Sequence, residues 1–171
     1  MKIWVVNDDG IDSDGIKVLA RHALKFGEVT VIAPVEQCSG MSQRLTIGLF
    51  ENGKVKRNIK KVPFPVKGVK AAYAVKGTPT DCVIVASEYI TEKPDIVFSG
   101  INHGENAGID ILYSGTIGAA MEALVQRIPA IAFSLKWEAT GYELVDQEID
   151  QCQTFGIKHN HSGQFSSISV V

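Results

Sequence analysis

Short apolar runs alternate with helical patterns along most of this chain. This alternation restricts the possible folds more than any other property of the sequence. Residues 3–6 and 29–33 form two such runs, each with the length of a buried strand. Between them, the apolar residues of segment 14–26 recur at the spacing of one helical face. Parallel strands joined by a right-handed crossover satisfy this order. We therefore predict a doubly wound, Rossmann-like α/β fold, with a mostly parallel sheet and helices on both faces.

The alternation is interrupted in the middle of the chain and then resumes. Residues 44–76 contain three strand-like pieces, and Asn52 and Gly53 favour a tight hairpin between the first two, because both tolerate positive φ. We interpret this region as a β-hairpin excursion from the main sheet. The later segments are predicted as helices over 79–90, 116–126 and 142–150, strands over 95–98 and 129–135, and a long loop over 99–115.

The composition is that of an ordinary globular domain and favours neither a nucleic-acid partner nor a membrane partner. The chain has 171 residues and a net charge of −2, which fits one domain without a strong global field. No apolar stretch reaches the roughly 18 residues of a membrane span, and the N-terminus lacks a signal-peptide pattern. The three cysteines are widely spaced and odd in number, as expected for reduced thiols. We expect a cytoplasmic protein.

Positive charge is concentrated between residues 54 and 76, a stretch without Asp or Glu. Its eight basic residues are Lys54, Lys56, Arg57, Lys60, Lys61, Lys67, Lys70 and Lys76. Such a stretch could attract anionic substrates, or it could be the solvated face of a hairpin. The second interpretation is the more common one for a run of charges.

Two adjacent carboxylates, Asp8 and Asp9, come directly after the first predicted strand. Ligands of open parallel sheets bind beyond the carboxyl ends of the strands. Neighbouring negative charges repel unless a cation neutralises them, and oxygen ligands suit hard ions such as Mg²⁺ or Mn²⁺. The pair therefore indicates a divalent cation site, and the alternative is a solvated turn in which Asp9 caps a helix.

Polar residues that follow later strands are predicted to reach the same edge of the sheet. Ser39 and Asn102 could be metal ligands there, or only turn residues. Residues 113–116 open a predicted helix whose free N–H groups and dipole could hold a phosphate, although Ser and Thr are also ordinary N-caps. His103 could be an acid or base, or a structural histidine. A cation beside an anion site suits phosphoryl transfer.

Five motifs, in order along residues 1–137, resemble those of the SurE family of nucleotidases. The family has a strand followed by Asn-Asp-Asp-Gly, a Ser-Gly loop, Gly-Thr-Pro-Thr-Asp-Cys, Ser-Gly-Ile-Asn-x-Gly-x-Asn, and a helix that starts with Tyr-Ser-Gly-Thr. The matching segments here are 7–10, 39–40 with Ser42 close behind, 77–82, 99–106 and 113–116. Five motifs in the same order make the resemblance specific.

The resemblance implies hydrolysis of nucleoside 5′- and 3′-monophosphates with one divalent ion, Mg²⁺ or Mn²⁺. The ligands that it implies for the ion are Asp8, Asp9, Ser39 and Asn102. The substrate contacts that it implies are Gly40, Ser42, Asn106, Ser114, Gly115 and Thr116. We take Asp8 and Asp9 as the catalytic residues, because either could polarise the attacking water together with the ion.

The family resemblance ends at about residue 137. Relatives usually continue well beyond the length of this chain, with an arm that joins subunits into a homodimer or homotetramer. Residues 138–171 do not resemble that region. We expect a SurE-like phosphatase domain over 1–137 and a divergent segment over 138–171 that is not a separate domain, which leaves the assembly open.

Three other functions fit parts of the pattern. Asp8 could be a covalent nucleophile, but aspartyl phosphatases use Asp-x-Asp rather than adjacent residues. A receiver-type signalling domain also begins with an acidic pair that binds Mg²⁺, but it needs an Asp where the later strand here ends in Phe98, Ser99 and Gly100. The third alternative is a catalytically impaired protein that binds nucleotide or phosphate without turnover.

Overall fold

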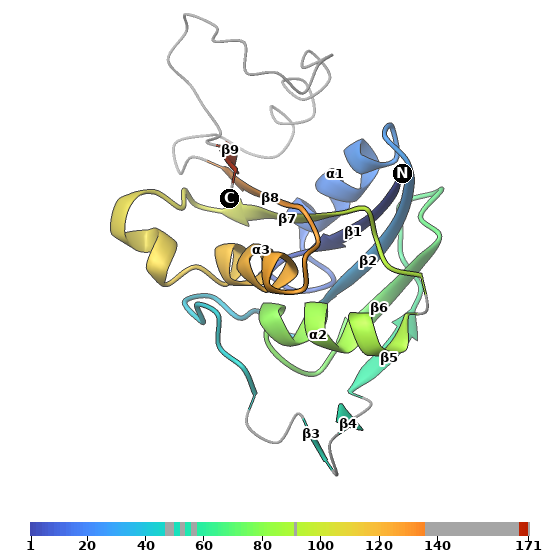
Figure 1. Cartoon of the computed structure of the whole chain (residues 1–171). Coiled ribbons are helices and arrows are strands. Elements are labelled where there is room, and N and C mark those ends of the chain that lie inside the picture. Colours follow the sequence, from blue (N-terminus) through green and yellow to red (C-terminus); the bar gives the residue numbers. More distant parts are fainter. Residues whose placement is uncertain (47–49, 52–53, 56–57, 91, 136–167, 171) are drawn as a thin grey trace, which may run out of the picture.

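A seven-stranded sheet forms the centre of the computed structural model, which describes residues 1–46, 50–51, 54–55, 58–90, 92–135 and 168–170 (Figure 1). In spatial order its strands are β5 (Ile59–Val62), β6 (Ala71–Val75), β2 (Glu28–Pro34), β1 (Lys2–Val6), β7 (Ile96–His103), β8 (Ala130–Leu135) and β9 (Ile168–Val170). The five inner strands run parallel, and β5 and β9 pair antiparallel at the two edges. The predicted doubly wound α/β fold is confirmed.

Helices cover both faces of the sheet. Helix α1 (Asp14–Ala23) lies on one face, and α2 (Pro79–Tyr89) and α3 (Gly115–Val125) lie on the other (Figure 1). Each helix begins at a hydroxyl side chain that accepts a hydrogen bond from a first-turn N–H. These N-caps are Ser13, Thr78 and Ser114.

The two faces of β1 contribute to two separate hydrophobic clusters. Ile3 and Val5 pack in the cluster that contains α1, whereas Trp4 and Val6 pack in the cluster that contains α2 and α3. Side chains alternate in this way along any strand, so a run that is apolar at every position belongs inside a sheet with both faces covered. The continuous apolar run at the start of the chain therefore defines the central strand.

The middle of the chain differs from the prediction in one respect. Strands β3 (Phe50–Glu51) and β4 (Lys54–Val55) form a separate antiparallel pair, which confirms the hairpin, and its turn at 52–53 lies outside the described residues. Strands β5 and β6 belong to the main sheet, so the assignment of all of 44–76 to an excursion is wrong. The run Ala71–Val75 is apolar at every position and pairs in parallel with β2, as a buried inner strand requires.

The end of β7, the second neighbour of β1, also differs from the prediction. Strand β7 continues to His103, through a register shift between Ser99 and Asn102 in its pairing with β8, so the predicted loop from residue 99 is wrong in its first part. A short 3₁₀ helix, η1 (Gly108–Leu112), follows. Glycine and asparagine have low strand propensity, which hides this extension in the sequence. The predicted helix 142–150 lies outside the described residues.

The order of the strands reverses between β1 and β7. The chain passes from β1 to β2 and β6 on one side, and then returns to β7 and β8 on the other. The crevice beyond the carboxyl ends of two strands at such a switch point is the usual ligand site of this architecture. It is here that the adjacent carboxylates and Asn102 lie.

The structure can be compared with two expectations from the composition, which concern membrane spans and the cysteines. No helix within the described residues is long and apolar enough to cross a membrane. Cys38 and Cys82 are free thiols, and Cys152 lies outside the described part of the chain.

Candidate functional site

The two adjacent carboxylates lie in the turn between β1 and α1. Asp8 is buried, with 2% of its surface exposed, and Asp9 is half-buried. The side chain of Asn7 fixes the turn, because its Nδ2 donates to Gly10 O at 3.0 Å and to Ser13 Oγ at 2.7 Å. Gly10 has a φ of +97°, which a residue with a side chain rarely adopts. This turn holds both carboxylates at the end of the central strand.

The beginning of α3 packs directly on Asp8. Thr116 Oγ1 donates to Asp8 Oδ1 at 2.6 Å and lies 3.5 Å from Asn102 Oδ1. A Cβ atom at Gly115 would lie 2.9 Å from Asp8 Cβ, so only glycine allows this approach. Asn102 Nδ2 donates to Gly104 O at 2.7 Å, which directs its amide oxygen toward Thr116. Side chains from the turn after β1, from β7 and from α3 thus meet, as predicted for Asp8 and Asn102.

The loop after β2 contacts the carboxylate pair at Asp9. Gln37 Nε2 donates to Asp9 Oδ1 at 3.4 Å and to Ser39 Oγ at 3.0 Å. The backbone N–H of His103 donates to Asp9 Oδ2 at 3.3 Å, so the backbone of β7 contacts the second carboxylate. The structure therefore brings together the four predicted metal ligands, Asp8, Asp9, Ser39 and Asn102.

Burial is the main electrostatic feature of the carboxylate pair. The pKa of Asp8 is raised from 3.8 to about 6, mainly by burial and to a smaller extent by the charge of Asp9, against the lowering effect of the hydrogen bond from Thr116. The ion pairs found within the described residues are made by Lys2, Lys17 and Lys70, and none includes either carboxylate. A buried acid beside a second acid, without a basic partner, suits a cation.

The donor atoms of the predicted site bear on which cations it would suit. Within the described residues no three His, Cys, Asp or Glu side chains gather as a metal cluster. The four predicted ligands instead offer carboxylate, amide and hydroxyl oxygens. Such oxygens fit Mg²⁺ or Mn²⁺, and these four residues offer no nitrogen or sulfur ligand of the kind that structural zinc sites use.

The N-terminus of α3 also supports the loop that contains the predicted substrate contacts Gly40 and Ser42. Ser42 N donates to Tyr113 O at 2.8 Å. A Cβ atom at Gly118 would lie 2.2 Å from Ser42 O, so the loop rests on the backbone of the helix. Gly40 is exposed, and a Cβ atom there would meet no atom within 4 Å. The space around Gly40 is therefore open, while Ser42 two residues later contacts α3.

Several hydroxyls and amides predicted to contact substrate have partners within the protein. Ser114 Oγ accepts from Ile117 N at 3.2 Å, and Thr116 Oγ1 donates to Asp8. Asn106 Nδ2 donates to Ser134 Oγ at 2.7 Å, so this side chain contacts β8. The first N–H groups of a helix have no intrahelical acceptor. The backbone of the first turn of α3 is thus the stronger candidate for a phosphate site, and the side-chain assignments stay predictions.

Sequence reasoning missed three polar residues that hold the site together. Asn7 orders the turn, Gln37 joins Asp9 to Ser39, and Ser99 Oγ donates to Thr116 O at 2.7 Å. Asn7 and Ser99 stand inside the matched motifs, so their positions were visible in the sequence. Their roles were not, because a buried Asn or Ser side chain can equally well satisfy local backbone groups.

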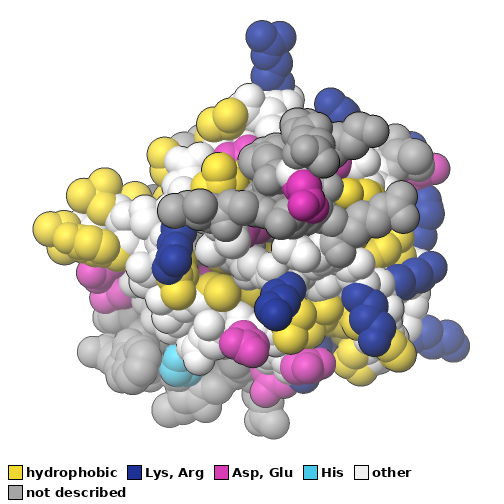
Figure 2. All heavy atoms as spheres, turned by 90° about the horizontal axis from the view of Figure 1, so that it is seen from below, with side chains coloured by type: hydrophobic (Ala, Val, Ile, Leu, Met, Phe, Trp, Pro, Cys, Tyr) yellow, Lys and Arg dark blue, Asp and Glu magenta, His cyan; other side chains and the backbone are white. Residues whose placement is uncertain are grey.

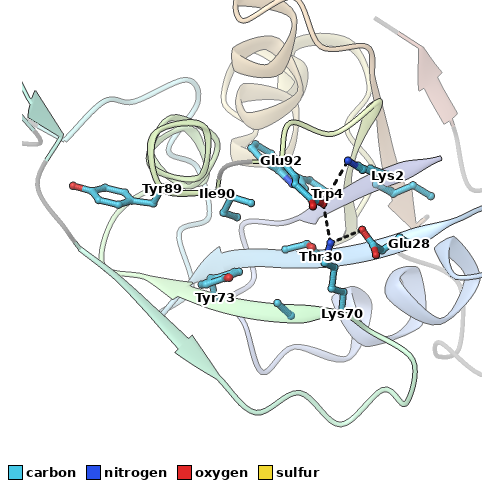
Figure 3. A pocket seen from close by; sticks show the side chains of 11 residues that line it. Lys2, Trp4, Glu28, Thr30, Lys70, Tyr73, Tyr89, Ile90 and Glu92 are labelled. Atoms are coloured by element: carbon cyan, nitrogen blue, oxygen red, sulfur yellow. Dashed lines mark hydrogen bonds and ion pairs between the residues drawn. The ribbon is translucent and has the colours of Figure 1, made fainter.

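A hollow of about 210 Å³ lies at the opposite edge of the sheet, by the amino ends of the strands (Figure 3). Lys70 Nζ lies 2.8 Å from carboxylate oxygens of both Glu28 and Glu92, and Lys2 Nζ lies 3.4 Å from Glu92. These exposed charges satisfy one another, and exposed ion pairs contribute little to stability. In the described part of the chain, the carboxylates of the hollow are paired with lysines, unlike the adjacent Asp8 and Asp9 at the other edge.

The surface carries apolar and basic regions on different sides. Figure 2 shows apolar side chains at the left-hand edge, on the side where Figure 1 places the loop with η1; the exposed residues there include Ile109, Leu112 and Tyr113. Lys60 and Lys61 on β5 are exposed, as the solvated-face interpretation of the basic stretch expects. The apolar residues directly precede the N-cap of α3.

The fold and the site together define an α/β protein in which two adjacent carboxylates and a helix N-terminus lie at the switch point of its sheet. The sequence model of the family described as Survival protein SurE matches residues 3–166. The chain therefore belongs to the SurE family, and the resemblance seen in its motifs is confirmed.

Individual relatives agree with this assignment. The chain is 46% identical over 134 residues to 5′-nucleotidase SurE of Chlorobium chlorochromatii, covering 78% of this chain and 46% of that protein. It is 43% identical over 152 residues to 5′-nucleotidase SurE of Methanothermobacter thermautotrophicus, covering 88% and 55%. The crystal structure of the SurE protein from Aquifex aeolicus superposes with a TM-score of 0.68 at 33% identity, covering 92% and 62%. The chain spans about half the length of the curated relatives it matches.

Proposed function

We propose that this chain hydrolyses nucleoside 5′- and 3′-monophosphates to nucleoside and phosphate, with one divalent cation, Mg²⁺ or Mn²⁺. The observation that carries the proposal is the buried Asp8, which lies beside Asp9 and against the start of α3 without a basic partner among the described ion pairs. The similarity to proteins named 5′-nucleotidase SurE supports the choice of substrate.

Asp8, Asp9, Ser39 and Asn102 would hold the cation. When bound, the cation supplies charge neutralisation at the phosphate and helps to polarise water. The chain prepares these ligands before the cation arrives, because Thr116 orients Asp8 and Gln37 orients Asp9 relative to Ser39. Ligands held by a second set of hydrogen bonds bind metal with a lower ordering cost.

Phosphate binding, proton transfer and nucleoside binding are assigned to other parts of the chain. The first turn of α3 offers backbone N–H groups to the phosphate oxygens, and its dipole favours their negative charge. The oxygen of a water molecule attacks phosphorus while the ester P–O bond breaks. Asp9, the more exposed of the two acids, is suited to accept the water proton, and the nucleoside oxygen leaves with a proton from solvent. The exposed Leu112 and Tyr113 offer an apolar surface for the nucleoside beside the phosphate.

A second candidate is binding of nucleotide without turnover. It draws on one observation, that the chain spans about half the length of its curated relatives. Calorimetric binding of AMP without phosphate release would identify it.

Removal of divalent ions is expected to abolish phosphate release from AMP. The physical reason is that the developing charge at phosphorus would then face two carboxylates without a cation. Phosphate release should be measured over a panel of nucleotides with EDTA, and again after Mn²⁺ or Mg²⁺ is restored. Release that is unchanged in EDTA would contradict the proposal.

The affinity for Mn²⁺ is expected to fall below about pH 6. A proton and the metal compete for Asp8, whose pKa burial raises to about 6, so the affinity should decrease by about tenfold for each pH unit below that value. Titration calorimetry of the metal-free protein over a pH series would show this. An affinity that stays constant down to about pH 4.5 would mean that Asp8 is not a ligand.

A further inference from the structure

A second buried aspartate, Asp81, lies in the first turn of α2 and joins two parts of the chain that are distant in sequence. Its side chain is fully buried. Its Oδ2 accepts from Thr78 N at 2.8 Å, and its Oδ1 accepts from Thr46 N at 3.0 Å. Its Oδ2 also accepts a short hydrogen bond from Thr46 Oγ1. One carboxylate therefore receives three donors.

These hydrogen bonds have two different functions. The bond from Thr78 N completes the capping box of α2 and is local to that helix. The two bonds from Thr46 hold the end of the segment 39–46, which contains neither helix nor strand. Hydrogen bonds to a buried carboxylate are among the strong ones, because a buried charge without donors is very unfavourable.

The surroundings of Asp81 leave little room for another arrangement. A Cβ atom at Gly77 would lie 2.6 Å from Asp81 Oδ2 and 2.9 Å from its Cβ, so the chain before α2 packs directly on this side chain. Thr78 Oγ1 also binds segment 39–46, since it donates to Arg44 O at 2.6 Å. Asp81 is thus fixed from one side by its own helix and binds the segment on the other.

The segment held in this way contains three residues predicted for the site. Ser39 is joined to Asp9 through Gln37, and Ser42 N donates to Tyr113 O just before α3. Between these contacts and Thr46, the segment has no regular backbone structure of its own. The middle of the segment contacts α3, where Gln43 Nε2 donates to Glu122 Oε2 at 3.3 Å, and Asp81 holds the end at Thr46, which is farther from the carboxylate edge.

We propose that Asp81 is a positioning residue, which fixes the segment 39–46 against α2 and thereby sets the affinity of the site for the phosphate of its substrate. The inference rests on the proposed function. Asp81 would touch neither substrate nor cation, and its contribution reaches the phosphate through the placement of Gly40 and Ser42.

The substitution Asp81→Asn tests this directly. Asn has one acceptor oxygen, and its amide nitrogen would face a donor from Thr46 or Thr78, so the segment loses part of its hold. We expect KM for AMP to rise by about tenfold or more, with a smaller change in kcat. We also expect faster hydrogen exchange at the Ser42 amide.

The control is Val85→Ala on the same helix. Val85 is fully buried in a hydrophobic cluster that contains no residue of segment 39–46, so this change lowers stability without removing a hydrogen bond to the segment. It should leave KM and the exchange of Ser42 near the values of the unsubstituted protein. Equal KM and equal exchange in Asp81→Asn and Val85→Ala would overturn the proposal.

A second variant covers the case in which Asp81→Asn fails to fold. Thr46→Val removes only the hydroxyl donor and leaves the capping box of α2 intact. We expect a rise in KM and faster exchange at Ser42, and unchanged values of both would overturn the proposal. If the unsubstituted chain released no phosphate at all, the proposed function would fail, while exchange at Ser42 would still decide whether Asp81 holds the segment.

Discussion

Asp8→Asn is expected to lower phosphate release by about a thousandfold and, at the same time, to make the metal-free protein more stable at about pH 8. Asn keeps the oxygen that accepts from Thr116 Oγ1 but cannot supply a negative charge to a cation. This combination is expected for a residue whose ionisation lowers the stability of the fold but is required for activity.

The sign of the stability effect follows from the direction of the pKa shift. Burial raises the pKa of Asp8 from 3.8 to about 6, so the folded protein holds this proton more tightly than the unfolded chain. The free energy of unfolding of the metal-free protein therefore falls as pH rises through this window, by up to about 3 kcal/mol. Asp8→Asn removes that loss.

Thermal or urea unfolding in EDTA at about pH 4 and about pH 8 would measure the effect. The control is Asp12→Asn, the same substitution at an exposed position nearby, which should change neither activity nor the pH dependence of stability. An Asp8→Asn protein that is less stable than the unsubstituted protein at about pH 8 would show that the carboxylate is stabilised by the fold.

Gly118→Ala is expected to destabilise the protein, against the usual effect of this substitution inside a helix. Alanine normally stabilises a helix interior by about 1 kcal/mol relative to glycine. At this position its Cβ atom would lie 2.2 Å from Ser42 O and 2.7 Å from Ser42 C, which are backbone atoms. We expect the free energy of unfolding to fall by about 1–3 kcal/mol, and KM for AMP to rise as the loop is displaced.

Urea unfolding and steady-state kinetics would measure both effects. Met121→Ala serves as the control on the same helix, because this side chain is 43% exposed and its loss should have little effect. A Gly118→Ala protein that is more stable than the unsubstituted chain, with an unchanged KM, would show that segment 39–46 does not depend on its contact with α3.

Much of the fold could be predicted because a buried strand and an amphipathic helix leave different periodicities. The run Ile3 to Val6 predicts a buried strand, which the structure confirms as β1, and the sheet topology then shows it to be an inner strand. The extension of β7 to His103 was hidden, since Gly100 and Asn102 have poor strand propensity, and the extension pairs with β8 only after a register shift, at Asn102 and His103. Tertiary pairing overrides local preference at such positions.

The members of the site could be predicted better than their contacts. Asp8 and Asn102 were placed together correctly because both lie at the carboxyl ends of neighbouring parallel strands, β1 and β7, at the switch point. The donation from Thr116 to Asp8 could not be foreseen, because it depends on how closely the glycine at the start of α3 lets the helix approach. The role of Asp81 was hidden for the same reason, since its partner Thr46 is 35 residues away.

The central claim is that one cation binds where β1 ends, between its two acids and the neighbouring β7 and loop oxygens. Crystals soaked in Mn²⁺ and measured at an anomalous wavelength would test it most directly. The account predicts a single peak in contact with Asp8, Asp9 and Asn102, with Ser39 as a further ligand. A map with no peak at this edge of the sheet, or with Mn²⁺ bound only elsewhere, would contradict it.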